Sequence, residues 1–129
     1  MLKKHKILVV DDERAIASAR ATILESRNYE TATALSGEEA VKIASWFQPD
    51  CIVSDIAMGT MNGVEAAIEI LGVLPRCKVF FISGNVCSDD LLEKARAKGF
   101  DFEVLQKPLP PPEMLARVEQ ICSLSNQPS

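Results

Sequence analysis

The five residues Cys51-Ile52-Val53-Ser54-Asp55 decide how the rest of the chain is arranged. The first four form a short apolar run that is rich in β-branched side chains and follows a proline-aspartate pair, which predicts a buried strand. Asp55 ends the run, and the next segment, 56–63, carries two glycines and an asparagine, which predicts a loop. Open α/β sheets bind their ligands beside such strand ends. A single aspartate here can also be an ordinary turn residue, so other stretches must decide between the two interpretations.

Apolar runs and helical periodicities alternate along the whole chain. Continuous apolar runs predict buried strands, and apolar residues spaced by three or four predict amphipathic helices. The expected strands are 6–10, 29–34, 51–55, 78–83 and 102–106, and the expected helices are 14–27, 36–47, 64–71, 91–98 and 111–121. This alternation predicts an α/β fold with a parallel sheet covered by helices on both faces.

Length and composition indicate one globular domain. The chain has 129 residues, of which 47% are apolar and 25% charged, and its core is expected at about 6–122 with a tail at 123–129. A net charge of −4 without a basic stripe argues against nucleic-acid binding. No apolar run approaches a membrane span, and the basic start is followed by too few apolar residues for a secretion signal. We therefore expect a cytoplasmic protein.

Cysteine and histidine usage argues against several kinds of active site. The chain contains Cys51, Cys77, Cys87 and Cys122 without C-x-x-C spacing, and His5 is its single histidine. This pattern argues against a Cys/His zinc site and against a Ser-His-Asp or Cys-His catalytic unit. The expected state of the cysteines is that of buried free thiols in a reducing compartment.

Chemically active residues follow four of the five predicted strands. Because the carboxyl ends of parallel strands share one edge of a sheet, these residues are expected to converge there. They are Asp11 and Asp12 after the first strand, Asp55 after the third, Ser83 and Gly84 after the fourth, and Lys107 and Pro108 after the fifth. Each alone could be a helix cap, a turn or a strand end, but together they predict a site.

Phosphoryl transfer is the chemistry that suits this set. Two carboxylates about 5 Å apart repel by about 3 kcal/mol at an effective dielectric of about 20. One lysine cannot offset three of them, so a hard divalent cation with oxygen ligands, Mg²⁺, is expected. An aspartate can then act as a nucleophile that forms an aspartyl-phosphate, while Lys107 neutralises the transferring oxygens and Ser83 donates to the phosphoryl group.

From Lys6 to about Cys122, the chain resembles a response-regulator receiver domain of two-component signalling. The resemblance implies a flavodoxin-like, three-layer (βα)5 fold with a five-stranded parallel sheet in the order 2-1-3-4-5. It also implies that residues 1–129 form a single receiver domain. The motifs that carry the resemblance are Val9-Val10-Asp11-Asp12-Glu13, Asp55 with Met58, Met61 and Gly63, Phe81-Ile82-Ser83-Gly84, and Lys107-Pro108.

The resemblance also assigns roles to the site residues. Asp55 is implied to be the phosphoacceptor, and Asp12 to bind Mg²⁺ directly. Asp11 is implied to bind the ion mostly through water, with Asp55 and the backbone carbonyl of Ala57 completing the protein ligands. Ser83 and Lys107 are implied to contact the phosphoryl group, and a cis peptide is expected before Pro108.

The implied function is signalling rather than enzymatic turnover of a substrate. The phosphodonor would be a phosphohistidine on a histidine kinase or phosphotransfer protein. The output would pass to a downstream protein through the face made by the helix 91–98, the strand 102–106 and the helix 111–121.

Two positions depart from the family pattern. Gly59 stands where the family usually has proline, so the loop after Asp55 should be looser. Val104 stands three residues before Lys107, where the family usually has the aromatic residue that turns inward on activation. Phe102 lies two residues earlier on the same strand face and could replace that residue.

Three other functions can be compared with the sequence. An aspartate-nucleophile phosphohydrolase is disfavoured, because it needs a second aspartate two residues after the first, where this chain has Ala57. A flavin mononucleotide protein needs a phosphate cradle after the first strand, where Asp11 and Asp12 would repel phosphate. A receiver fold that is never phosphorylated, and that serves only as a protein-binding platform, stays open at this point.

Overall fold

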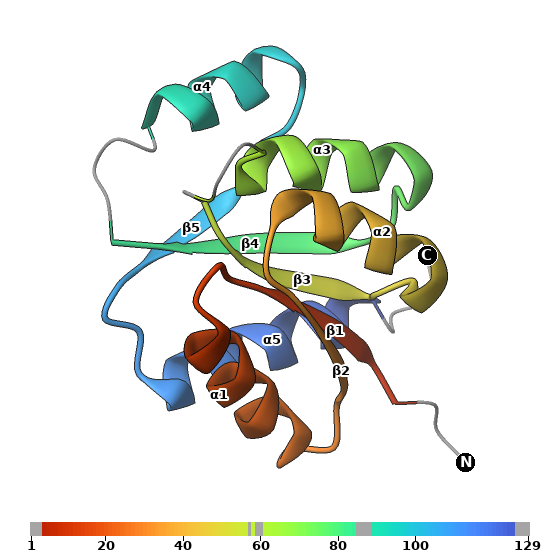
Figure 1. Cartoon of the computed structure of the whole chain (residues 1–129), viewed down its shortest axis with the longest axis vertical. Coiled ribbons are helices and arrows are strands. Elements are labelled where there is room, and N and C mark those ends of the chain that lie inside the picture. Colours follow the sequence, from red (N-terminus) through yellow and green to blue (C-terminus); the bar gives the residue numbers. More distant parts are fainter. Residues whose placement is uncertain (1–3, 57, 59–60, 85–88, 126–129) are drawn as a thin grey trace.

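The structure is a computed structural model that describes residues 4–56, 58, 61–84 and 89–125. In this part of the chain, five strands alternate with five helices (Figure 1). Their bounds are β1 Lys6–Val10, α1 Arg14–Glu25, β2 Glu30–Ala34, α2 Gly37–Phe47, β3 Cys51–Asp55, α3 Gly63–Val73, β4 Lys78–Ser83, α4 Asp89–Ala97, β5 Glu103–Gln106 and α5 Pro111–Ser125. None of the helices described here is both long and apolar enough to cross a membrane.

All five strands are parallel and form one sheet in the order β2-β1-β3-β4-β5. The α/β class predicted from the alternation and the strand order implied by the resemblance are therefore confirmed. In the register of the sheet, Val10 lies opposite Ser54, and Asp55 opposite Ile82. The residues that follow β1 and those that end β3 and β4 consequently meet at one edge.

Helices cover both faces of the sheet, with α1 and α5 on one face and α2, α3 and α4 on the other (Figure 1). Successive side chains of β1 point to opposite faces of the sheet. Because helices cover both faces, the sequence of this strand is apolar without interruption. Ile7 and Val9 pack in the cluster beneath α1 and α5, whereas Leu8 and Val10 pack in the cluster beneath α2 and α3. Burial on both faces holds the central strands rigid, which fixes the positions of the residues at their ends.

Several helix boundaries differ from the sequence prediction. Helix α1 ends at Glu25 rather than at residue 27, because Asn28 adopts a left-handed conformation (φ 71°) that turns the chain toward β2. Helix α5 continues to Ser125, so residues 123–125, predicted as part of a tail, are helical. No glycine or proline follows Cys122 before Pro128, so the sequence contains nothing that stops the helix at the predicted point.

Side chains cap the first turns of both α2 and α3. The Ser36 hydroxyl accepts a hydrogen bond from the Glu39 backbone amide at 3.0 Å. At α3, the Asn62 side chain accepts from the Glu65 amide at 2.9 Å, and the Glu65 carboxylate accepts from the Asn62 amide at 3.2 Å. The Asn-Gly pair suggested only a loop, although it also begins a helix.

Three cysteines are buried free thiols, as predicted: Cys51, Cys77 and Cys122. Cys87 lies outside the described residues. Burial raises the pKa of Cys77 to about 12 and that of Cys122 to about 11, and it also raises the pKa of Cys51. Since the thiolate is the reactive form, these three side chains should be chemically inert in the folded protein.

This inertness can be measured. In the native protein at pH 8, we expect Cys51, Cys77 and Cys122 to react with iodoacetamide at least about 100-fold more slowly than in urea. Burial keeps the reagent away from these side chains and disfavours formation of the reactive thiolate. Peptide mapping of the alkylated chain over time would report each site separately. Rapid native labelling of any of the three would contradict the burial described here.

Candidate functional site

Three carboxylates gather at the carboxyl edge of the sheet. Asp11 and Asp12 directly follow β1, and Asp55 is the last residue of β3. Each offers one carboxylate oxygen, and these oxygens lie within 4.8 Å of one another. Asp11 is only 1% exposed, Asp55 is partly buried and Asp12 is exposed. The sequence prediction that these side chains converge is therefore met by the geometry.

The Asp55 carboxylate is held by a backbone amide and faces a lysine. Its Oδ1 accepts a hydrogen bond from the Ile56 amide at 2.8 Å, and its Oδ2 lies 3.7 Å from Lys107 Nζ. Burial raises the pKa of Asp55, Lys107 opposes that effect, and the carboxylates of Asp11 and Asp12 raise the pKa further. The site therefore holds more negative charge than its lysine balances, and a cation would relieve it.

Ser83 and Lys107 lie next to each other at the same edge. Ser83 is buried at the end of β4, one residue beyond Ile82, which pairs with Asp55. The Lys107 amide donates to the Ser83 carbonyl at 2.9 Å, which extends the pairing of β4 with β5 by one residue. The Lys107-Pro108 peptide is cis, as the resemblance implied.

Arg20 is a site residue that the sequence analysis missed. Its Nη1 donates to Asp11 Oδ2 at 3.1 Å, while the Glu13 amide donates to Asp11 Oδ1 at 2.9 Å. The Arg20 side chain is 14% exposed. The helical pattern could have revealed it, because Arg20 lies between Ala17 and Leu24 on the buried stripe of α1. An arginine on such a stripe needs a buried acidic partner.

The first turn of α3 lies directly against the backbone of Asp55. The Gly63 amide donates to the Ile56 carbonyl at 2.8 Å, and the Ser54 hydroxyl donates to the Asp55 carbonyl at 2.7 Å. A Cβ atom added to Gly63 would lie 2.2 Å from the Asp55 carbonyl oxygen. Glycine is required here because the two backbones touch. Ala57 and Gly59, which the sequence analysis singled out, lie outside the described residues.

The aromatic residues next to β5 form a short stack. Phe102 lies edge-on to Phe81, with ring centroids 5.2 Å apart, and is stacked on Phe100 at 5.8 Å. Val104 packs in the same apolar cluster as Phe102, although Phe102 immediately precedes β5 rather than belonging to it. Phe81 lies two residues before Ser83, so the stack begins near the acidic edge.

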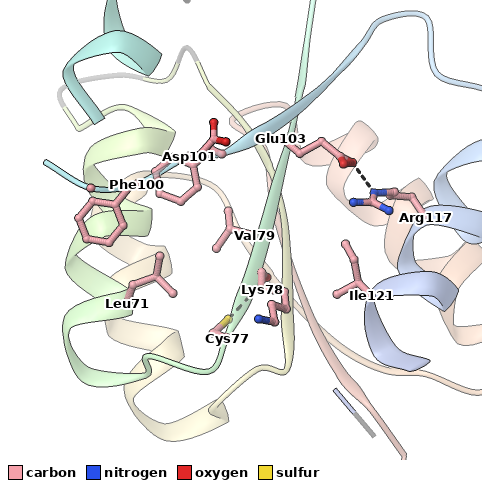
Figure 2. A pocket seen from close by; sticks show the side chains of 11 residues that line it. Leu71, Cys77, Lys78, Val79, Phe100, Asp101, Glu103, Arg117 and Ile121 are labelled. Atoms are coloured by element: carbon pink, nitrogen blue, oxygen red, sulfur yellow. Dashed lines mark hydrogen bonds and ion pairs between the residues drawn. The ribbon is translucent and has the colours of Figure 1, made fainter. Parts of the chain in front are cut away.

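A groove of about 680 Å³ opens at the opposite end of the sheet, away from the carboxylates. Cys77, Lys78 and Val79 line it at the start of β4, with Phe100 on one side of this strand and Ile121 on the other (Figure 2). An ion pair between Arg117 of α5 and Glu103 of β5 lies at its side. None of the predicted site residues lines this groove, so the chemistry belongs to the acidic edge instead.

The sequence of the chain matches the model of a known protein family. The family model "Response regulator receiver domain" matches residues 7–119. The chain belongs to this family. Receiver domains are signalling phosphoacceptors rather than enzymes in the usual sense.

Individual relatives support this assignment. The chain is 30% identical over 117 residues to the chemotaxis protein CheY of Thermotoga maritima, covering 90% of this chain and 96% of that protein. It is 36% identical over 119 residues to the alkaline phosphatase synthesis transcriptional regulatory protein PhoP of Bacillus subtilis, covering 90% of this chain and 48% of that protein. The receiver therefore spans about half the length of several regulators that it matches.

Solved structures give the same result. The structure of Vibrio cholerae chemotaxis protein CheY4 superposes with a TM-score of 0.81 at 26% identity, covering 92% of this chain and 99% of that one. A response regulator receiver domain protein from Clostridium thermocellum superposes with a TM-score of 0.82 at 27% identity, covering 93% and 95%. The receiver fold thus accounts for nearly the whole chain.

Proposed function

We propose that this receiver accepts a phosphoryl group on Asp55 within a two-component phosphorelay. The observation that supports the proposal most strongly is the arrangement at the acidic edge, where Asp11, Asp12 and Asp55 meet with Lys107 beside the Asp55 carboxylate. The donor is a phosphohistidine on a histidine kinase or phosphotransfer protein in the cytoplasm. The carboxylate oxygen of Asp55 attacks phosphorus, the phosphorus–nitrogen bond breaks, and the imidazole leaves with the bonding electrons.

The residues at this edge fit a magnesium ion. Three carboxylates with oxygens within 4.8 Å of one another form the kind of donor set that hard divalent cations prefer. Asp12 and Asp55 would hold the ion directly, and buried Asp11 would hold it through water, with the Ala57 carbonyl as a further ligand. When bound, Mg²⁺ supplies positive charge that offsets the charge of the phosphoryl oxygens.

The protein's own residues have separate tasks in the transfer. Lys107, 3.7 Å from Asp55 Oδ2, would neutralise charge on the phosphoryl oxygens as they approach. Ser83 follows Ile82, the residue of β4 that pairs with Asp55, and its hydroxyl would donate a hydrogen bond to the phosphoryl group after transfer. The Ile56 amide orients the Asp55 carboxylate through its hydrogen bond to Oδ1.

Phosphorylation would then alter the face made by α4, β5 and α5. The aspartyl-phosphate adds about −2 charge beside Ser83 and Lys107, at the ends of β4 and β5. The Phe81–Phe102–Phe100 stack joins β4 to the segment that leads into β5, so a shift at Ser83 can reach that face through it. A downstream protein that binds this face would detect the change as a population shift.

The proposed linkage can be tested by chemical trapping. After incubation with a phosphorylated donor, reduction with borohydride should convert the acyl phosphate at residue 55 to homoserine, and hydroxylamine should remove the label. A phosphoryl label on the peptide that contains Asp55, released by hydroxylamine, supports the proposal. A label on serine or threonine that hydroxylamine does not remove would contradict phosphorylation of Asp55, and the absence of any label would point to the unphosphorylated platform.

The metal site can be tested separately by substitution. Asp12→Asn should weaken Mg²⁺ binding at least about 10-fold, because it removes one of the charged oxygens that would contact the ion. Isothermal titration with MgCl₂ measures the affinity. Glu30→Gln is the matched control, since it removes one exposed acid at the other end of the sheet. Equal affinities for both variants would show that the ion does not bind at Asp12.

A further inference from the structure

The pairing of Arg20 with Asp11 is the feature of the site that its proposed chemistry leaves unused. Asp11 is 1% exposed, and both of its oxygens already accept hydrogen bonds, Oδ1 from the Glu13 amide and Oδ2 from Arg20 Nη1. A buried carboxylate without a cation is costly in free energy, and the guanidinium offsets that cost in the absence of metal. Arg20 therefore stabilises the same charge that a divalent cation would stabilise.

The sequence of α1 gives Arg20 room to reach the site. Ala17 and Ala21, which flank it on the buried stripe, are 1% and 5% exposed. Their small side chains leave space for the apolar stem of an arginine to lie against the helix while its charged end reaches Asp11. The contact spans nine residues from the end of β1 to the middle of α1.

Charge balance determines what Arg20 does to metal binding. The carboxylates of Asp11, Asp12 and Asp55 face two cations, Arg20 and Lys107, so the cluster carries one net negative charge. Without Arg20 it would carry two. A divalent cation is drawn to the larger negative charge and is repelled by a guanidinium that contacts one of its own ligand groups.

We propose that Arg20 is a positioning residue that acts as a built-in counter-cation. It fixes Asp11, keeps the empty site stable, and lowers the affinity of the site for Mg²⁺. With both Asp11 oxygens engaged, the remaining lone pairs favour a water-mediated contact to the ion over a direct one. The inference rests on the proposed function in one respect only, namely that the site takes a divalent cation.

The test combines Mg²⁺ titration with thermal unfolding in EDTA and in Mg²⁺. Arg20→Gln should bind Mg²⁺ at least about 5-fold more tightly than the wild type, because it removes a repelling charge. Its melting temperature in EDTA should be lower than that of the wild type, and Mg²⁺ should raise this temperature by more than it does for the wild type. Arg20→Lys, which keeps the charge, should bind Mg²⁺ nearly as the wild type does. Arg27→Gln, an exposed charge removal after the same helix, is the control and should change neither property.

A second pair of variants keeps the test valid if Arg20→Gln does not fold. Asp11→Asn with Arg20→Gln leaves no buried charge unpaired, and it should bind Mg²⁺ at least about 5-fold more tightly than Asp11→Asn alone. Unchanged or weaker binding after removal of Arg20 in either background would overturn the inference while leaving the proposed function intact. A wild type that binds no Mg²⁺ at all would overturn both.

Discussion

Gly63→Ala is expected to destabilise the protein by about 3 kcal/mol. The added Cβ would lie 2.2 Å from the Asp55 carbonyl oxygen and 3.0 Å from Ser54 Oγ. Neither the end of β3 nor the first turn of α3 can move easily. Asp55 is paired with Ile82 of β4, and a capping box holds the start of α3. Urea unfolding would show the loss as a lower midpoint.

The same substitution elsewhere in α3 provides the control. A Cβ added to Gly72 would meet no atom within 4 Å, so Gly72→Ala should stabilise the protein by about 0.5 kcal/mol through helix propensity. Opposite signs for the two variants would separate steric contact from the general effect of removing a glycine. Equal stabilities would show that α3 does not pack against Asp55 as described.

Lys107→Met is expected to slow phosphorylation of Asp55 by about 100-fold. Lys107 Nζ lies 3.7 Å from Asp55 Oδ2, the closest cation to the proposed nucleophile among the described residues. Methionine keeps most of the apolar stem but removes the charge that would balance the phosphoryl oxygens. The rate with acetyl phosphate in saturating Mg²⁺ gives the comparison, and circular dichroism confirms that the variant is folded.

Lys78→Met is the matched control for that experiment. Lys78 is exposed at the start of β4, at the far end of the sheet from Asp55. The same change of charge there should leave the rate within about 2-fold of the wild type, because exposed charges a sheet length away are screened by salt. Equal slowing by both substitutions would show that net charge, rather than the position of Lys107, controls the reaction.

The sequence predicted the architecture because burial on two faces leaves a strong pattern. The apolar runs of β1 and β3, in a chain where strands alternate with amphipathic helices, favour a parallel sheet covered on both faces, and the residues after such strands meet at one edge. The positions of Asp11, Asp12, Asp55, Ser83 and Lys107 followed from that topology. Their roles in phosphorylation and metal binding stay predictions until the experiments above are performed.

The features that sequence reasoning missed depend on contacts that no local pattern contains. Arg20 reaches Asp11 across nine residues, and only the packing of α1 on β1 brings them together. Asn62 caps α3 although its Asn-Gly pair also favours a turn, so the pattern alone could not decide between the two. Helix α5 continues beyond its predicted end, because the sequence has no glycine or proline there to stop it. Without such a residue, the sequence pattern could not locate the end of the helix.

Intact-mass measurement after incubation with acetyl phosphate tests the central claim most directly. The wild type with Mg²⁺ should gain one phosphoryl group, whereas the wild type in EDTA and Asp55→Asn with Mg²⁺ should gain none. This outcome would establish Asp55 as a metal-dependent phosphoacceptor. A wild type that binds Mg²⁺ yet gains no phosphoryl group, or an adduct that persists in Asp55→Asn, would contradict the account.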